Sequence, residues 1–239
     1  MRVLIDEHKN HMRLDARTEH IFNYIVRDFI ATAAPVPSVK ISKKRDLSIS
    51  PATIRNIMLE LDEGGFLEQP HISAGRVPTD KGYRYFVEHL IEWKEPPRKI
   101  KDFFSLEQEP RDAFFEEMSR AISQHLHLLS VVASPQHHRF LQSGLAEVLR
   151  NPEFCESSVT ISFAREIEEL ENDMEKFRSN ATEPEISIKE FGMVRTSFQD
   201  NEWGECTMIS LGPKRMNYEE ARSILRYAKK KLDNTNCHG

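Results

Sequence analysis

Two neighbouring polar residues, Arg55 and Asn56, have side chains suited to reading DNA bases. An arginine guanidinium can donate two hydrogen bonds to guanine O6 and N7, and an asparagine amide can pair in the same way with adenine. Each such contact discriminates against the wrong base by about 1–3 kcal/mol. For both contacts to form, the two side chains must project from one face of a rigid element into the major groove.

A helix that begins at Ser50 would position them. Serine is a favoured N-cap residue, and Pro51 suits the first helical position, where its missing N–H has no intrahelical partner. Ile54, Met58 and Leu61 recur at i, i+4 and i+7, so they predict a face that packs on a core. The opposite face then carries polar residues, as a recognition helix does.

The segments around this helix follow the order of a winged helix-turn-helix. A short helix predicted at 39–45 precedes it, and the glycine pair 64–65 ends it. Residues 66–70 and 76–78 suit the two strands of a wing, and Thr79 is a favoured cap for the next helix. The sequence therefore predicts a DNA-binding domain.

The predicted DNA contacts divide by chemistry. Lysines on or beside the 39–45 helix would neutralise phosphates, and hydroxyls at the start of the recognition helix would hold phosphate where the helix dipole favours anions. The wing would approach the backbone or a minor groove. The full set is Lys40, Lys43, Lys44, Ser50, Thr53, Arg55, Asn56, His71, Ser73 and Arg76.

The two arginine assignments have structural alternatives, and so has the basic segment that contains Arg55. Arg76 could pair with Asp80 instead of DNA, and Arg55 with an acid such as Glu60. Residues 40–55 hold five basic side chains against one acidic side chain, in a chain of net charge −5. A charge run is often only a solvated face, but a local basic face on an acidic protein also favours phosphate attraction with little non-specific binding elsewhere.

Three stretches resemble the HrcA family of bacterial heat-inducible transcription repressors. They are SPATIRN from Ser50, LEQPHISAGRVPTDKGYRYFV from Leu67 and GPKRMNYEE from Gly212. The resemblance implies an N-terminal winged helix and a C-terminal GAF-like domain that carries an inserted dimerisation segment. It also implies a homodimer that represses chaperone operons at an inverted-repeat operator in double-stranded DNA, and the chaperonin GroEL as a partner that keeps the repressor competent.

The chain departs from the family pattern at three places. Ile57 stands where relatives carry an acidic residue, and Pro37 stands where they carry glycine. We expect Ile57 to widen the core stripe or to contact a thymine methyl group. Few residues separate Ala133 from Leu141, where the family has its inserted segment, so most of that segment is missing here.

Composition excludes several other classes of protein. The three cysteines are far apart and odd in number, which argues against a disulfide framework or a CxxC zinc site. No apolar run approaches the ~18–20 residues that cross a bilayer. His125 and His127 would face different sides of one helix and make poor joint metal ligands. We find no catalytic or nucleotide-binding motif, and we predict a cytoplasmic protein that is not an enzyme and needs no cofactor.

The predicted fold class is α+β, with a winged helix followed by a GAF-like domain. In the second domain we expect helices near 115–129 and 159–177, strands near 128–133, 186–188, 193–198 and 205–211, and a last helix opened by Asn217. The predicted segments are an N-terminal extension at 1–12, a winged-helix domain at 13–94, a linker at 95–111, a GAF-like domain at 112–233 and a tail at 234–239.

Three rival functions remain beside the repressor. The GAF-like domain could respond to a small-molecule effector, the winged helix could serve protein contact, or it could accompany an enzyme with no recognisable site. The last helix carries an apolar stripe that would serve either a dimer contact or packing on the domain's own sheet. The stripe consists of Tyr218, Ala221, Leu225, Ala228 and Leu232.

Overall fold

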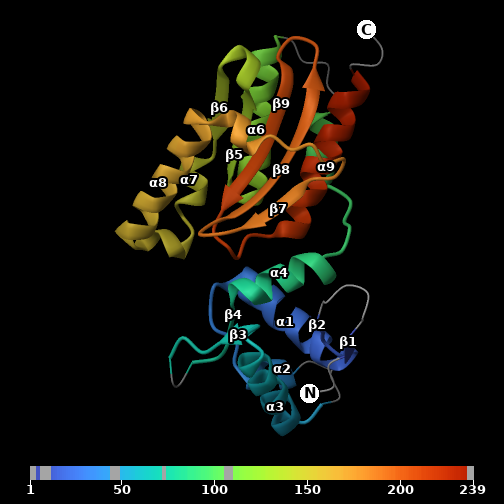
Figure 1. Ribbon diagram of the computed structural model, residues 1–239, viewed down its shortest axis with the longest axis vertical. Coiled ribbons are helices and arrows are strands. Elements are labelled where there is room, and N and C mark those ends of the chain that lie inside the picture. The colour runs from blue at the N-terminus through green and yellow to red at the C-terminus, as the bar shows by residue number, and fades with distance from the viewer. Residues whose placement is uncertain (1–3, 6–11, 44–48, 72–73, 105–109, 236–239) are drawn as a thin grey trace. The chain divides into compact units, whose positions relative to one another are not determined.

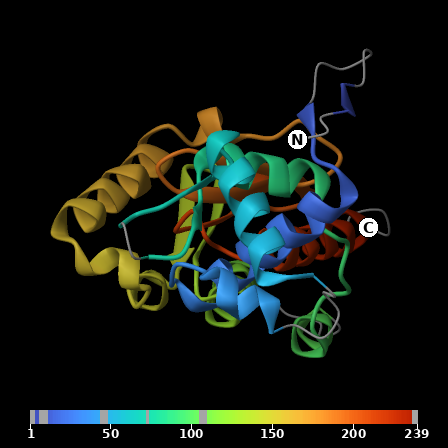
Figure 2. The ribbon, with the colours of Figure 1, turned by 90° about the horizontal axis from the view of Figure 1, so that it is seen from below.

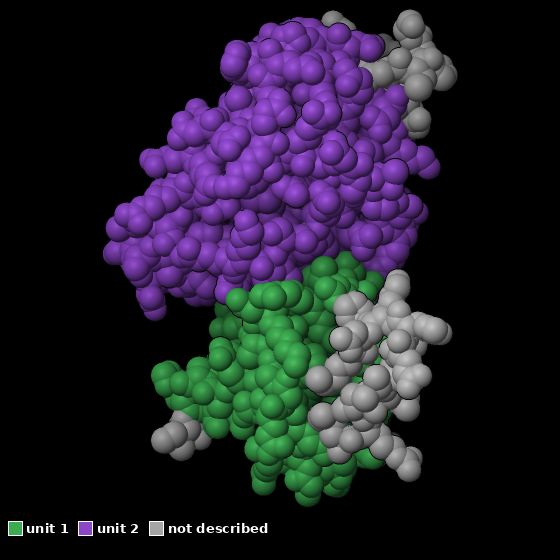
Figure 3. Space-filling view, viewed as in Figure 1, with its two compact units in different colours: residues 1–91 green, residues 92–239 purple. Residues whose placement is uncertain are grey.

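The chain forms two compact units, residues 1–91 and 92–239 (Figure 3). The computed structural model describes residues 4–5, 12–43, 49–71, 74–104 and 110–235. Both units combine helices with antiparallel strands, which confirms the predicted α+β class.

The described residues of unit 1 form four helices and two small pairs of antiparallel strands (Figure 1). Its helices are α1 (Ala16–Thr32), α2 (Ser38–Ser42), α3 (Pro51–Glu63) and α4 (Asp80–His89). Its strands are β1 (Leu4–Ile5), β2 (Met12–Arg13), β3 (Leu67–Glu68) and β4 (Val77–Pro78), paired β1 with β2 and β3 with β4.

Capping side chains set the N-terminal ends of these helices, and the cap at Thr79 was predicted from the sequence. The Asp15 carboxylate accepts hydrogen bonds from the Arg17 and Thr18 amides at the start of α1, each at 3.1 Å. The Thr79 hydroxyl accepts a hydrogen bond from the Gly82 amide at 3.1 Å and opens α4. The helix α2 is shorter than predicted, because it ends at Ser42.

An aromatic cluster joins the helices of unit 1 to its hairpin. The rings of Phe22, Phe66 and Tyr85 meet edge to face at centroid distances of 5.3–5.9 Å. The Tyr85 hydroxyl donates to the Glu19 carboxylate at 2.7 Å and accepts from the Leu14 amide at 3.1 Å. Burial and the hydrogen bond to Glu19 raise the pKa of Tyr85 to about 12. Tyr85 is buried, so its ring is part of the core of unit 1.

Unit 2 is a five-stranded antiparallel sheet in the order β6-β5-β9-β8-β7. Its strands are β5 (Leu129–Ser134), β6 (Arg139–Ser143), β7 (Glu185–Ile188), β8 (Gly192–Asp200) and β9 (Gly204–Gly212). Its helices are α5 (Arg98–Phe103), α6 (Arg111–Leu126), α7 (Leu145–Val148), α8 (Ser157–Asn172) and α9 (Tyr218–Thr235).

Helices cover both faces of this sheet. Side chains alternate along a strand, so Leu129 and Val131 share one face of β5. They join a buried cluster with Val148 of α7 and Phe163 of α8. On the other face, α6 packs on β5 and α9 packs on β8, an arrangement that Figure 1 shows. The sheet is therefore the middle layer of unit 2.

Some elements of unit 2 differ from the sequence prediction. The strand β6 was not expected, and the helix expected at 159–177 is interrupted after Asn172 and followed by a separate 3-10 turn at Met174–Phe177. The segment expected to be a linker contains α5.

A tight hairpin lies at the place where the resemblance implies an inserted segment. Strands β5 and β6 pair up to Ser134 and Arg139, and a short 3-10 turn, Pro135–His137, joins them. An insertion at this turn would extend the hairpin tip and leave the sheet pairing in place.

The apolar stripe of α9 is fully covered within unit 2. Tyr218, Ala221, Leu225 and Ala228 are each 0% exposed, and the helix packs on β8. This stripe therefore serves the unit's own core, and our alternative of a dimer contact is wrong. Among the described helices, none is long and apolar enough to cross a membrane.

Candidate nucleic-acid interface

The N-terminus of α3 is capped by a pair of hydroxyl side chains. The Ser50 Oγ accepts a hydrogen bond from the Thr53 amide at 3.1 Å and lies 2.9 Å from the Thr53 Oγ1. Pro51 occupies the first helical position, as predicted. The capped end directs the helix dipole and its free amides toward the surface, which favours an anion there.

The outer face of α3 presents four residues at helical spacing. Ala52, Arg55, Asn56 and Leu59 lie at i, i+3, i+4 and i+7, and all four are exposed. Ile57 is only 7% exposed and widens the buried stripe, one of the two roles expected for it. Leu59 is 46% exposed, although large apolar side chains are usually covered. Sequence reasoning missed Leu59, and its i+3 spacing from Asn56 was the available signal.

Arg55 is held by no acidic side chain in the described part of the chain, so the expected alternative of a pair with Glu60 is not formed. Asn56 is exposed beside it. Both side chains can therefore turn outward without breaking an existing contact.

A groove of about 360 Å³ separates α3 from the β3–β4 hairpin. Arg55, Met58 and Leu59 line it from the helix, and Gln69 and Arg76 line it from the hairpin. Figure 2 views unit 1 from the side on which α3 lies, and the hairpin arms extend away from the helices. The groove thus brings Arg55 and Arg76, two residues predicted from the sequence, to one surface.

Arg76 joins the β3–β4 hairpin to the rest of unit 1. Its backbone exchanges two hydrogen bonds with Val36, at 2.9 and 3.0 Å. Its guanidinium Nε lies 2.9 Å from the Asp62 carboxylate of α3, and the side chain is only 13% exposed. The ion pair considered for Arg76 was with Asp80, but the structure gives Asp62. Gly75 permits this close approach, because a Cβ there would lie 2.3 Å from the Val36 carbonyl carbon.

The side chains predicted to contact phosphate differ in whether they already pair with another residue of the chain. Lys40 is 44% exposed and its ammonium lies 2.7 Å from the Asp28 carboxylate of α1. Lys43 is exposed at the end of α2. His71 is exposed and its carbonyl accepts a hydrogen bond from the Ala74 amide at 2.9 Å. Lys44 and Ser73 lie outside the described residues.

The histidines weighed as metal ligands in unit 2 have other neighbours. His125 Nε2 lies 2.8 Å from the Glu220 carboxylate, and His127 Nδ1 lies 3.7 Å from the Glu147 carboxylate. In the described part of the chain, no group of three or more potential metal-binding side chains comes together.

Comparison with known proteins finds similar sequences for about half of the chain. No family model matches. The fold is similar to that of a solved structure described as the crystal structure of a hypothetical protein, with a TM-score of 0.78 and 15% identity over 93% of this chain and 98% of that one. That likeness concerns the fold alone.

Curated sequences give a more specific similarity. The chain is 44% identical over 128 residues to the heat-inducible transcription repressor HrcA of Desulfitobacterium hafniense, covering 52% of this chain and 37% of that protein. It is 41% identical over 143 residues to HrcA of Carboxydothermus hydrogenoformans, covering 58% and 42%. The match spans less than half the length of these relatives. Over about half of its own length, the chain thus resembles HrcA repressors.

Proposed function

We propose that the chain is a sequence-specific transcription repressor that binds an inverted-repeat DNA operator as a homodimer and regulates chaperone operons. The observation that carries the proposal is the outer face of α3, where Arg55 and Asn56 are exposed beside a groove and engaged by no described acidic side chain. The similarity to HrcA repressors supports the choice of repressor over other DNA-binding proteins.

In this proposal, unit 1 is a winged helix. Helices α2 and α3 are the helix-turn-helix, the β3–β4 hairpin is the wing, and α3 enters the major groove. Arg55 reads guanine and Asn56 reads adenine, while Leu59 and the side of the groove exclude water around them. Ser50 and Thr53 hold a phosphate at the start of α3.

The remaining residues contribute to affinity in different ways. Lys43 contacts phosphate directly, whereas Lys40 must exchange the Asp28 carboxylate for a phosphate, which reduces its gain. Arg76 has a positioning role, because its ion pair with Asp62 fixes the wing against α3. Unit 2 is the GAF-like part, and GroEL is the partner that the resemblance implies. The site of action is cytoplasmic DNA.

Fluorescence anisotropy with two labelled duplexes tests the proposal. One duplex carries the inverted repeat of the HrcA type and the other has both half-sites scrambled, and both are titrated over a salt series. We expect the repeat to bind tighter by about 10³-fold or more, with two chains per duplex. Light scattering on the free protein measures the dimer independently.

Arg55→Ala is the informative variant, and Arg84→Ala is its matched control. Arg84 is an exposed arginine on α4, so its loss removes the same charge from another face of unit 1. We expect Arg55→Ala to reduce the preference for the repeat by about 5- to 150-fold, the equivalent of 1–3 kcal/mol, and Arg84→Ala to leave it unchanged. Equal binding of wild type to both duplexes, or equal losses in the two variants, would contradict sequence-specific reading by α3.

A further inference from the structure

Trp93 is a half-exposed tryptophan that the fold nevertheless holds in place. Its side chain is 51% exposed. On one side, the Glu92 amide donates to the Glu219 carboxylate at 2.8 Å, and on the other the Lys94 amide donates to the Ser223 hydroxyl at 3.3 Å. Glu219 is 2% exposed and also pairs with the Lys94 ammonium at 2.9 Å. The backbone around Trp93 is therefore fixed to α9 without burying the ring.

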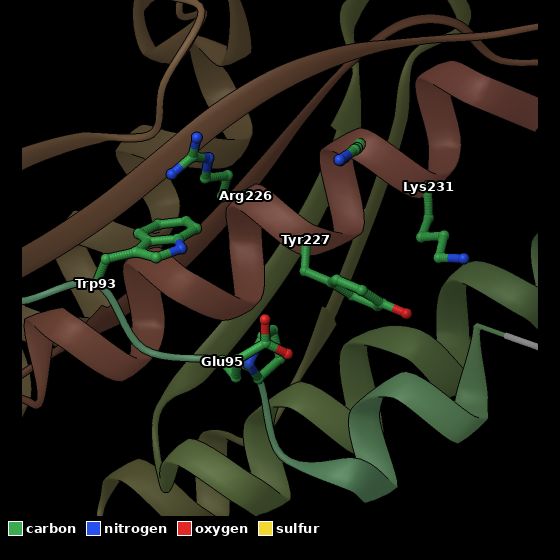
Figure 4. Close-up of a pocket in the computed structure, with 7 residues that line it drawn as sticks. Trp93, Glu95, Arg226, Tyr227 and Lys231 are labelled. Atoms are coloured by element: carbon green, nitrogen blue, oxygen red, sulfur yellow. The ribbon is translucent and has the colours of Figure 1, made fainter.

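A guanidinium covers part of this ring. The Arg226 Cζ lies 3.8 Å from the Trp93 ring centroid, and Figure 4 shows the arginine above the indole. Arg226 is held from a second direction by Glu183, at 3.1 Å. Because both groups are fixed, the rest of the indole surface is presented to solvent in one orientation.

Basic and aromatic side chains continue from Trp93 along α9. Arg226, Tyr227, Lys230 and Lys231 lie at i, i+1, i+4 and i+5, which is one face of a helix. Together with Trp93 and the segment Glu95–Pro96 they line a cavity of about 440 Å³. This volume lies within the range of small-molecule sites, about 300–1,000 Å³.

The charge of the cavity is positive. Its one acidic side chain, Glu95, is already hydrogen-bonded by the Lys101 ammonium, and this contact lowers the pKa of Glu95. Lys230 is exposed, and no described acidic side chain pairs with it. Lys231 lies over the Tyr227 ring, with its ammonium 5.6 Å from the centroid. A ligand with negative charge and a flat apolar part would match these groups.

We propose that this cavity binds a nucleoside phosphate, with the base stacked against Trp93 and Tyr227 and the phosphates held by Lys230 and Lys231. Aromatic rings accept any base by stacking, and lysines meet phosphate as point charges. The site lies wholly in unit 2 and is distinct from the proposed DNA-binding face of α3. It goes beyond the repressor function and does not rest on it.

Calorimetric titration of the full chain with AMP, ADP and ATP tests the site, with adenosine and inorganic phosphate as separate fragments. We expect a nucleotide to bind more tightly than either fragment. Trp93→Leu and the double variant Lys230→Glu/Lys231→Glu should each weaken binding about tenfold or more. Fluorescence of Trp203, which is buried in unit 2, checks that each variant is folded.

Two control variants make the result specific. Lys189→Glu reverses an exposed charge on the turn between β7 and β8, and Arg55→Ala changes the face of α3. Both should bind the nucleotide as the wild type does. The proposal is overturned if no nucleotide binds at millimolar concentration, if phosphate alone binds as well as nucleotide, if Trp93→Leu has no effect, or if either control loses binding to the same extent as the site variants.

Discussion

Helices α3 and α9 both bury an apolar face in their own unit, but the contacts of their outer faces differ. Each begins with a polar cap, Ser50 or Asn217, and each buries an apolar stripe in its own unit. On α3 the outer face carries Arg55 and Asn56, which no described acidic side chain engages. On α9 the outer Arg226 already contacts Trp93 and Glu183. Apolar spacing therefore identifies the covered face, and function has to be sought in the contacts of the other face.

The largest effect should come from the covered face of α9. Leu225→Ala removes a side chain that is 0% exposed, and we expect unit 2 to lose about 2–5 kcal/mol of stability. Urea unfolding followed by tryptophan fluorescence measures this, because both tryptophans lie in unit 2. Arg55→Ala on α3 should stay within about 0.5 kcal/mol of wild type. If the Leu225→Ala protein were a monomer and as stable as wild type, the stripe would instead be a dimer contact.

A smaller loss of stability is expected where the β3–β4 hairpin meets the rest of unit 1. In Gly75→Ala the new Cβ would meet the Val36 backbone at 2.3 Å, so the hairpin must shift, at about 1–3 kcal/mol. Hydrogen exchange of the Val36 and Arg76 amides should accelerate, since they bond to each other's carbonyls. Ala74→Ser, one residue away, is the control and should leave both rates near wild type. Unchanged exchange in Gly75→Ala would mean that the hairpin is not held there.

Tyr85 gives unit 1 a pH dependence. Its pKa is raised from 10.0 to about 12 in the folded protein, chiefly by burial and then by the hydrogen bond to Glu19. The phenol is neutral in both states below pH 10, so its contribution is complete there and is lost as pH rises from 10 toward 12.

Comparison with Tyr85→Phe isolates this contribution. At pH 8 the variant should be less stable than wild type by about 1–2 kcal/mol, because two hydrogen bonds are lost in a buried site. The difference should shrink at pH 11, where the unfolded wild-type phenol ionises. Urea midpoints from far-UV circular dichroism measure it, and a difference independent of pH would refute the assigned shift.

The smallest effects should come from the two caps. Ser50→Ala and Asn217→Ala each remove the acceptor of one helix N-terminal amide, and each should lower stability by about 1 kcal/mol. The losses should appear in different units, in α3 for Ser50 and in α9 for Asn217. Helix-specific hydrogen exchange separates them, and a loss at Ser50 that also frays α9 would show that the units do not respond independently.

Local signals were sufficient to predict α3. The cap at Ser50, the proline at 51 and the glycine pair at 64–65 act within a few residues, and the helix has the predicted limits. The exposure of Arg55 and Asn56 followed from the spacing of the apolar residues. Whether these side chains touch DNA stays a prediction.

Long-range contacts were beyond the sequence. Arg76 pairs with Asp62, which no spacing rule singles out over Asp80. Tyr85 is buried because α1 and the hairpin meet around it, which its own helix does not reveal. The strand β6 is defined only by its pairing with β5, because apolar and polar residues do not alternate clearly along it.

The pairing of β5 with β9 has a consequence for synthesis on the ribosome. Leu129 pairs with Leu211, so the centre of the sheet cannot close until residue 211 has emerged. Unit 1 needs only residues that are made before those of unit 2. Domains generally fold as units during synthesis, N-terminal first. In a nascent chain, unit 1 should therefore be folded before β9 is available to pair with the apolar strand β5. Unit 2 is most prone to aggregation during this interval.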